Sequence, residues 1–243
     1  MQIFVFRDAA SVAEAASMVF AAQLYQKPES VLGLATGSTP IPTYQALIEL
    51  SQKGLVDFSR ARTFNLDEYV GLTPNHPCAY RRFMDEQLFR HIPIDARNTH
   101  VPSGLGNPEE NARAYDRMIE AAGGIDLQLL GIGRNGHIGF NEPAADYTWG
   151  THVVKLTQST LEANARWFDD PKDMPREAIS LGIGGIMEAK RVILIATGTD
   201  KAEAVARAAL GPVSPDSPAS ILRFHQNAQL MLDENAAALL KNR

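Results

Sequence analysis

The order of apolar and amphipathic segments predicts an α/β fold: a single domain built on one open, mostly parallel, twisted sheet with helices on both faces. Short apolar runs alternate with segments of helical length along nearly the whole chain. Some runs, such as residues 192–195, are apolar at every position, which is typical of parallel strands buried on both sides. The 243 residues are enough for one large core, and no repeat or linker divides them.

Each predicted strand is a short apolar run, and each predicted helix is a longer alanine-rich or amphipathic segment; Asp8 or Ser11 caps the first helix. The expected strands are residues 3–6, 31–35, 61–66, 125–130, 153–156, 178–182, 191–196 and 228–232. The expected helices are residues 8–26, 40–53, 76–89, 109–122, 159–167, 200–210 and 234–241. The Pro-rich stretch 211–218 and the stretch 167–175 are expected to be irregular.

Composition excludes several classes of protein. The formal net charge is −5, so no general positive field attracts nucleic acid or an anionic membrane. The single Cys78 excludes an internal disulfide and a cysteine-based metal site. The chain begins without the pattern of a signal peptide, and no apolar run approaches ~20 residues. We therefore expect a soluble, cytoplasmic protein.

A glycine turn with two hydroxyls, Gly37-Ser38-Thr39-Pro40, follows the strand at 31–35. Backbone N–H groups, hydroxyls and the start of a helix together make a site for an anion such as phosphate. The Lys and the spacing of a P-loop are missing. The alternative is a capped helix start with Pro in its first turn, and the sequence leaves both interpretations open.

Two adjacent carboxylates, Asp67 and Glu68, follow the strand at 61–66. Carboxylates at the end of a strand are candidates for proton-transfer chemistry. Successive side chains of a strand point in opposite directions, so we expect only one of the two to face a site. The alternative is a polar strand end in which Asp67 caps another segment.

The stretch from Gly131 to Pro143 combines four glycines with His137, Glu142 and two carboxamides. It contains a literal G-x-G-x-x-G, the pattern of dinucleotide-binding loops. That interpretation needs a helix inside the motif, and the later glycine and proline leave no room for one. We expect instead a catalytic loop in which His137 transfers protons and Glu142 orients it. The alternative is a glycine-rich structural turn around a hydrogen-bonded histidine.

Two cations are candidates for the anion site. Arg166 lies near the end of the predicted helix at 159–167, and Lys201 lies where a strand meets the helix at 200–210. Each alone is most often a solvated surface charge, but together they would complete a phosphate site at Gly37. The other histidines lack metal-ligand spacing, and no Gly-x-Ser-x-Gly elbow occurs, so we predict no metal and no serine nucleophile.

The chain resembles the glucosamine-6-phosphate deaminase family in three long motifs that occur in the same order. The motifs are residues 32–40, 64–72 and 133–143, with further similarity at 76–77, 163–166 and 198–202. The resemblance covers nearly the whole chain. It implies a Rossmann-like fold shared with 6-phosphogluconolactonase. It also implies conversion of glucosamine 6-phosphate and water to fructose 6-phosphate and ammonia, in the use of N-acetylglucosamine, without a cofactor.

The resemblance assigns roles to the candidate residues. Asp67 would be the base that moves a proton between C2 and C1; an Asp is ionised at neutral pH unless it is strongly desolvated. His137 would be the acid and base of ring opening, assisted by Glu142 and Asn135. Some members have Asp in place of Asn135, which cannot ionise and so could only orient its neighbours. The phosphate would bind to Gly37, Ser38, Thr39, Arg166 and Lys201.

The resemblance also implies a mobile lid at about residues 156–179 within one deaminase domain, 1–243. Longer members are hexamers that N-acetylglucosamine 6-phosphate activates through an Arg-x-Lys-Thr segment. The comparable stretch here is His152-Val153-Val154-Lys155, without the Arg and the first Lys. We therefore expect no such activation, and a monomer or small homo-oligomer, with a hexamer left open.

Two other functions fit parts of the pattern. The first is 6-phosphogluconolactonase, whose loop continues after the histidine without Phe-Asn-Glu-Pro. The second is a catalytically silent sugar-phosphate sensor, which would not need Asp67, His137 and Glu142 together.

Overall fold

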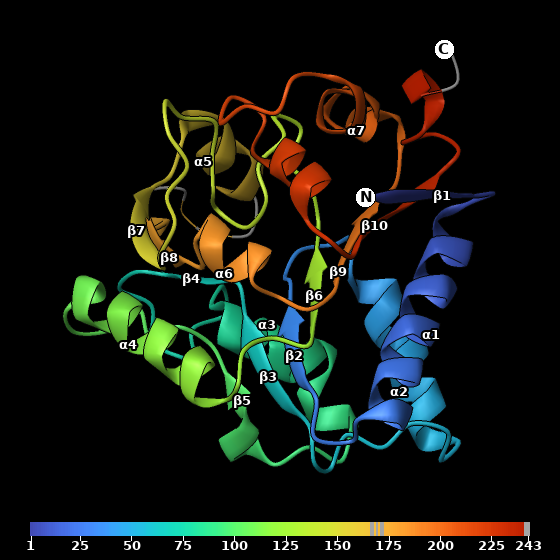
Figure 1. Ribbon diagram of the computed structural model, residues 1–243. Helices are drawn as coiled ribbons and strands as arrows, with labels where there is room; N and C mark the ends of the chain where they lie inside the picture. The colour runs from blue at the N-terminus through green and yellow to red at the C-terminus, as the bar shows by residue number, and fades with distance from the viewer. Residues whose placement is uncertain (166–167, 169, 171–172, 241–243) are drawn as a thin grey trace.

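The computed structural model describes residues 1–165, 168, 170 and 173–240, and all structural statements refer to these. A seven-stranded sheet, with every neighbouring pair parallel, forms the centre of the molecule (Figure 1). In spatial order its strands are β1 (Gln2–Phe6), β10 (Ala228–Asp233), β9 (Val192–Ala196), β6 (Leu127–Leu130), β2 (Val31–Leu34), β3 (Arg62–Asn65) and β5 (Thr99–His100). The predicted α/β fold with a mostly parallel sheet is confirmed.

A second, antiparallel sheet of three strands lies beside the first. Its order is β4 (Asp67–Tyr69), β8 (Glu177–Ser180) and β7 (His152–Lys155). The sequence predicted one strand at 61–66, but the chain leaves the main sheet at Leu66, whose N–H donates to Leu34 and whose carbonyl accepts from Leu181. Leu66 therefore joins the two sheets and turns Asp67 into the space between them.

Helices cover both faces of the main sheet; α1 and α2 pack together on one side and α4 lies on the other (Figure 1). The α-helices are α1 (Ala9–Gln26), α2 (Ile41–Gln52), α3 (Tyr80–Gln87), α4 (Pro108–Ala121), α5 (Gln158–Ala165), α6 (Ile183–Met187) and α7 (Ala202–Leu210). The 3-10 helices are η1 (Phe89–His91), η2 (Ala96–Asn98), η4 (Thr199–Lys201), η5 (Pro218–Phe224) and η6 (Ala238–Leu240). No described helix is both long and apolar enough to cross a membrane.

The boundaries of the predicted helices differ where side chains compete with the helix for hydrogen bonds. Of the two predicted caps, Asp8 is the one that caps α1, because its carboxylate accepts the N–H of Ser11. The helix predicted at 76–89 begins only at Tyr80, since the ring of His76 accepts the N–H of Cys78 and holds a turn.

The helix predicted at 234–241 is wrong over its described part. The chain forms turns and the short η6 there, and Asp233 accepts the N–H of Ala236. The short β5 and α6 were not predicted. β5 has two residues, and α6 contains Gly184 and Gly185, which have low helix propensity.

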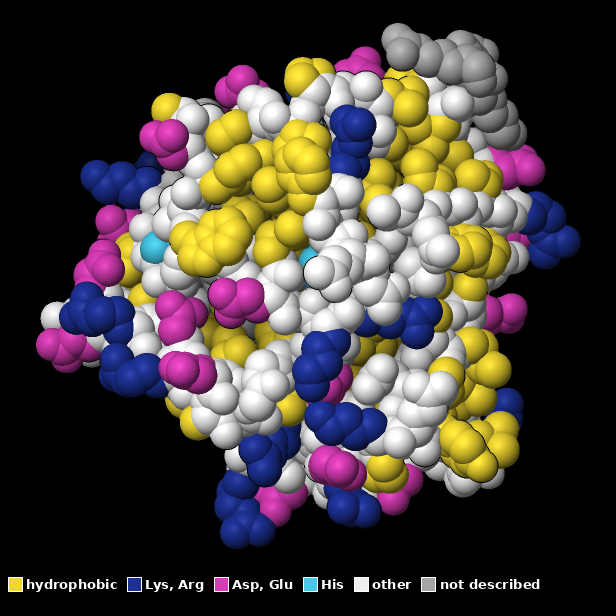
Figure 2. Space-filling view, viewed as in Figure 1, with side chains coloured by type: hydrophobic (Ala, Val, Ile, Leu, Met, Phe, Trp, Pro, Cys, Tyr) yellow, Lys and Arg dark blue, Asp and Glu magenta, His cyan; other side chains and the backbone are white. Residues whose placement is uncertain are grey.

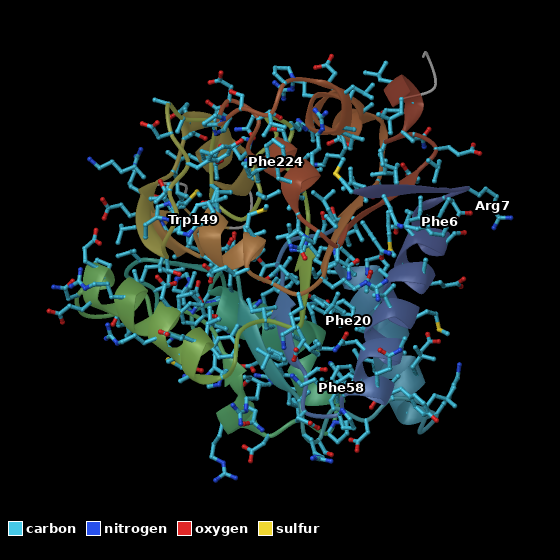
Figure 3. The ribbon with its side chains drawn as sticks, in the orientation of Figure 1. Phe6, Arg7, Phe20, Phe58, Trp149 and Phe224 are labelled. Carbon is cyan, nitrogen blue, oxygen red and sulfur yellow. The ribbon has the colours of Figure 1, made fainter. Side chains whose placement is uncertain are left out.

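Two apolar clusters hold the fold. The larger lies between the main sheet and its helices and includes Phe20 and Phe58, both fully buried (Figure 3). The smaller lies against the antiparallel sheet and contains Tyr69, Leu72, Ala79, Phe140, Leu156, Phe168, Met174 and Ala178. Phe140 of the smaller cluster and Ile138 of the larger both lie in the predicted catalytic loop. Asp67 lies between Leu66 of the larger cluster and Tyr69 of the smaller, so the candidate site lies where the two clusters meet.

The topology itself marks a position for the site. From β2 the chain builds β3 and β5 toward one edge, then returns to place β6, β9 and β10 on the other side of β2. The strand order therefore reverses between β2 and β6. In open α/β sheets, ligands bind past the carboxyl ends of the strands at such a point.

Candidate active site

The site is built from the segments that follow four neighbouring strands. In the order β9, β6, β2 and β3, these segments carry Lys201, the loop 131–143, the turn at Gly37 and Asp67. Since the strands are parallel, all four segments emerge at the same edge of the sheet. The structure thus places the candidates at one edge of the sheet, except for Arg166, which lies outside the described residues.

Asp67 is the first residue of β4 and is 6% exposed. It pairs in register with Ser180, and its Oδ2 lies 3.7 Å from the position that a Cβ on Gly139 would take. No hydrogen bond from a described residue reaches its carboxylate. Burial, aided by the charge of Glu68, raises the pKa of Asp67 to about 8. Asp67 is therefore desolvated strongly enough to disfavour its ionised form at neutral pH.

Glu68 has a structural role. Its carboxylate is buried and accepts the N–H groups of Tyr69, Tyr80 and Arg81, each at 2.9 Å. Tyr80 and Arg81 are the first residues of α3, so Glu68 caps that helix. This is the alternation predicted for adjacent strand residues: one carboxylate faces the site and the other holds the helix behind it.

The glycines of the loop 131–143 bring its backbone against other groups. A Cβ on Gly133 would lie 2.3 Å from the ring of His137, so the imidazole packs directly on the backbone. Gly136 has φ of +93°, a conformation that favours glycine. Every residue of this loop is described, and none is helical. The loop therefore lacks the helix that the dinucleotide interpretation requires.

Glu142 is buried but has a complete set of partners. Its Oε2 lies 3.3 Å from Nδ1 of His137 and accepts a hydrogen bond from Asn135 at 2.5 Å. Its Oε1 accepts a hydrogen bond from Thr160. Burial alone would raise its pKa, but His137, Thr160 and Asn135 together lower the pKa of Glu142 to about 2. Glu142 is therefore a fixed negative charge beside the histidine.

Asn135 connects the two ends of this arrangement. Its Oδ1 accepts the backbone N–H of His137 at 3.2 Å, while its Nδ2 donates to Glu142. A carboxamide can accept and donate at once. An Asp here would instead place a second carboxylate against Glu142. The geometry fits the purely orienting role that we expected for Asn135.

The turn after β2 has free donors. Gly37 has φ of +97°, and Pro40 is the N-cap of α2, which receives no hydrogen bond from a capping side chain. The capped-helix alternative would have used the hydroxyl of Ser38 or Thr39 for that purpose. Neither hydroxyl has a hydrogen-bond partner among the described residues, and Ser38 is exposed. Both remain available to an anion at the start of a 12-residue helix.

Lys201 lies in η4 at the start of α7 and is half-buried. No carboxylate oxygen of the described residues lies within 4.0 Å of its amine. Burial lowers the pKa of Lys201; Asp200 opposes this effect and Arg134 adds to it. Charges of both signs mix over the molecular face in Figure 2, so an anion would depend on local groups such as these. Arg134, paired with Asp200 at 3.0 Å, was not singled out from the sequence.

Two further residues of the site were missed. Thr160, on α5, binds Glu142, and Ser180, on β8, accepts the N–H of Phe140 at 3.0 Å. Ser180 has no sequence signal, because only the pairing of β4 with β8 brings it beside Asp67. Thr160 had a weak sequence signal, because Thr157 lies three residues before it, which is the spacing of a helix N-cap. No group of three potential metal ligands occurs within the described part of the chain.

Comparison with known proteins tests the resemblance. The family described as glucosamine-6-phosphate isomerases/6-phosphogluconolactonase matches residues 7–232. The glucosamine-6-phosphate deaminase of Shewanella woodyi is 51% identical over 244 aligned residues, which cover 100% of this chain and 92% of that protein. The deaminase of Clostridium perfringens is 49% identical, with coverage of 99% and 100%.

Solved structures extend the likeness to the fold. A monomeric glucosamine-6-phosphate deaminase superposes with a TM-score of 0.95 at 40% identity, covering 98% of this chain and 100% of that one. The 6-phosphogluconolactonase of Thermotoga maritima has a TM-score of 0.77 at 19% identity, over 96% and 99% of the chains, and shares the fold. The predicted family is confirmed. By its motifs, its topology and its full-length relatives, the chain belongs to the glucosamine-6-phosphate isomerase/6-phosphogluconolactonase family, on its glucosamine-6-phosphate deaminase branch.

Proposed function

We propose that the chain converts glucosamine 6-phosphate and water to fructose 6-phosphate and ammonia, in the catabolism of amino sugars. The observation that carries the proposal is one site with two buried carboxylates, Asp67 and Glu142, in opposite electrostatic environments. The reaction needs a base for a carbon-bound proton and a separate proton shuttle at the sugar ring. The 49–51% identity to curated deaminases supports the same reaction.

His137 opens the sugar ring. It takes the proton of the O1 hydroxyl and returns a proton to the ring oxygen, so the bond from C1 to that oxygen breaks and C1 becomes an aldehyde. Glu142 holds the imidazole for this transfer, and Asn135 holds both. Proton transfers of this kind typically contribute about 10²–10⁴-fold to the rate.

Asp67 then isomerises the open chain. It removes the C2 proton, the electron pair forms a C1–C2 double bond, and the oxygen at C1 takes up a proton. Return of the proton to C1 leaves an imine at C2, and water replaces ammonia there. The pKa of Asp67 is about 8 in the free site, and an ammonium group of the substrate beside it would favour the ionised form.

The turn of Gly37, Ser38 and Thr39, with Lys201, binds the substrate phosphate. The free hydroxyls and the start of α2 support this assignment, as does the half-buried amine of Lys201. Arg166 stays a predicted member of the site. The lid at about residues 156–179 of the single domain 1–243 also stays a prediction.

The partner of the chain is a small sugar phosphate, and the cytoplasm is the compartment where such substrates are held. A monomer or small homo-oligomer without activation by N-acetylglucosamine 6-phosphate fits the sequence His152-Val153-Val154-Lys155. The likeness to a monomeric deaminase supports the same state. Light scattering on the purified protein tests the oligomeric state, and the dependence of rate on substrate concentration, measured with and without that sugar phosphate, tests the activation.

One assay decides between the three candidate functions. The protein is incubated with glucosamine 6-phosphate, and ammonia and fructose 6-phosphate are measured; we expect equal amounts of both. Hydrolysis of 6-phosphogluconolactone without release of ammonia would establish the lactonase instead. Binding of the sugar phosphate without turnover of either substrate would establish a sensor.

A further inference from the structure

We infer that Thr160 is a positioning residue: its hydroxyl fixes the orientation of Glu142 and so maintains the proton shuttle at His137. The inference rests on the function proposed for Glu142. Thr160 lies on α5, outside the loop that carries His137 and Glu142, and the family resemblance assigned it no role.

The two oxygens of Glu142 are held from two different segments. Oε2 faces Asn135 and His137 of its own loop, whereas Oε1 accepts the hydroxyl of Thr160 at 2.5 Å. Thr160 is 6% exposed, so water does not readily replace it. Without this hydroxyl the carboxylate could rotate about its last side-chain bond, and Oε2 would leave the imidazole.

The hydrogen bonds around Thr160 have a defined direction. An ionised carboxylate only accepts, so the single hydroxyl proton of Thr160 goes to Glu142. The hydroxyl of Thr157, 3.0 Å away, must then donate to Thr160. The Thr157 oxygen in turn accepts the N–H of Thr160 at 3.3 Å and caps the start of α5. The helix start is thus built to present one donor to Glu142.

Other groups around Glu142 cannot replace this donor. Among the described residues, the titratable side chain within ion-pair distance of Glu142 is His137, and it contacts Oε2, not the Oε1 that Thr160 binds. The hydrogen bond from Thr160 is one of the effects that lower the pKa of Glu142. Loss of the hydroxyl should therefore both misorient the carboxylate and make it easier to protonate.

The test compares Thr160→Val, which keeps the shape and removes the hydroxyl, with Thr160→Ser, which keeps the hydroxyl. Gln158→Ala is the matched control, since it removes a hydrogen bond to Glu162 on the same helix. We expect Thr160→Val to lower kcat about tenfold with KM changed less than about twofold. Thr160→Ser and Gln158→Ala should keep at least about half of the wild-type kcat.

A second readout does not depend on turnover. Carbon-13 NMR follows the titration of the Glu142 carboxyl, assigned by its absence in Glu142→Gln. The midpoint should move upward in Thr160→Val and stay in place in Thr160→Ser. Wild-type kcat and an unchanged midpoint in Thr160→Val would overturn the inference. Equal damage by both Thr160 substitutions would also overturn it, because packing would then be the cause. A wild-type protein that titrates as expected but releases no ammonia would refute the proposed function alone.

Discussion

Two buried carboxylates in one site, Asp67 and Glu142, meet opposite conditions. Asp67 is 6% exposed, receives no hydrogen bond from a described residue, and has a pKa raised to about 8. The side chain of Glu142 is also 6% exposed, but three neighbours lower its pKa to about 2. Burial raises the pKa of both groups, and it is the hydrogen-bonding and charged partners of Glu142 that reverse the direction of its shift.

One site can therefore give two carboxylates different roles. A carboxylate with a raised pKa holds its proton strongly and can both take and return one near neutral pH. A carboxylate with a lowered pKa stays charged and serves as a fixed support for an imidazole. Substitutions at Asp67, Glu142 and Asn135 test this division of roles.

Asp67→Asn should cause the largest loss. The carboxamide fits the same space but cannot accept a proton from carbon, so kcat should fall about 10³-fold. Incorporation of solvent deuterium at C1 of the product should disappear, while ring opening and binding persist. Asp57→Asn, at an exposed turn, is the control and should retain full activity. Normal deuterium incorporation in Asp67→Asn would remove Asp67 as the base.

Glu142→Gln should cause a smaller loss, about 10²-fold in kcat, because the imidazole remains but loses its charged partner. A carboxamide also presents N–H groups to Asn135 or Thr160, which are donors themselves. Steady-state kinetics on the variant and on Glu49→Gln, an exposed control, measure this effect. A variant with more than half of the wild-type kcat would contradict the supporting role.

The same two positions should have opposite effects on stability. The folded pKa of Asp67, about 8, lies above the unfolded value of ~3.9, so the folded state binds more protons between these values. The wild type therefore loses stability as pH rises through this window, and Asp67→Asn does not. From pH 5 to pH 8, urea unfolding should show Asp67→Asn gaining about 4 kcal/mol relative to wild type.

For Glu142, the dependence of stability on pH has the opposite sign. Its folded pKa of about 2 lies below the unfolded ~4.3, so its stabilisation is present above pH ~4 and is lost as pH falls toward 2. Glu142→Gln should therefore be less stable than wild type at neutral pH. Two results would contradict this contrast between the carboxylates. One is a Glu142→Gln variant that is more stable than wild type at neutral pH; the other is a stability difference between Asp67→Asn and wild type that does not change with pH.

Asn135→Asp should have the smallest effect. A second carboxylate beside Glu142 would repel it, raise its pKa and move the acid limb of the kcat/KM profile upward, with kcat about fivefold lower at pH 6. Asn107→Asp adds the same charge at the N-cap of α4, in a different segment of the chain, and should leave the kcat/KM profile unchanged. An unchanged profile in Asn135→Asp would show that the carboxamide is not needed.

Much of this site was predictable from local pattern. Gly37, Asp67, His137 and Lys201 all follow apolar runs that the sequence marks as strands, and parallel strands deliver their ends to one edge of the sheet. The tail of the loop, with its glycine and proline, was enough to reject the dinucleotide pattern. The secondary-structure prediction was wrong where nearby side chains compete with the backbone for hydrogen bonds, as at Asp233 and at the turn of His76 before α3.

The fold class, the family and the candidate catalytic side chains could be predicted from the sequence alone, because periodicity and motifs are properties of neighbouring residues. The environment of those side chains became visible only in the folded structure. The pairing of β4 with β8 desolvates Asp67, and the packing of α5 supplies Thr160 to Glu142. A pKa depends on burial and on partners many residues away, and both exist only once the chain has folded.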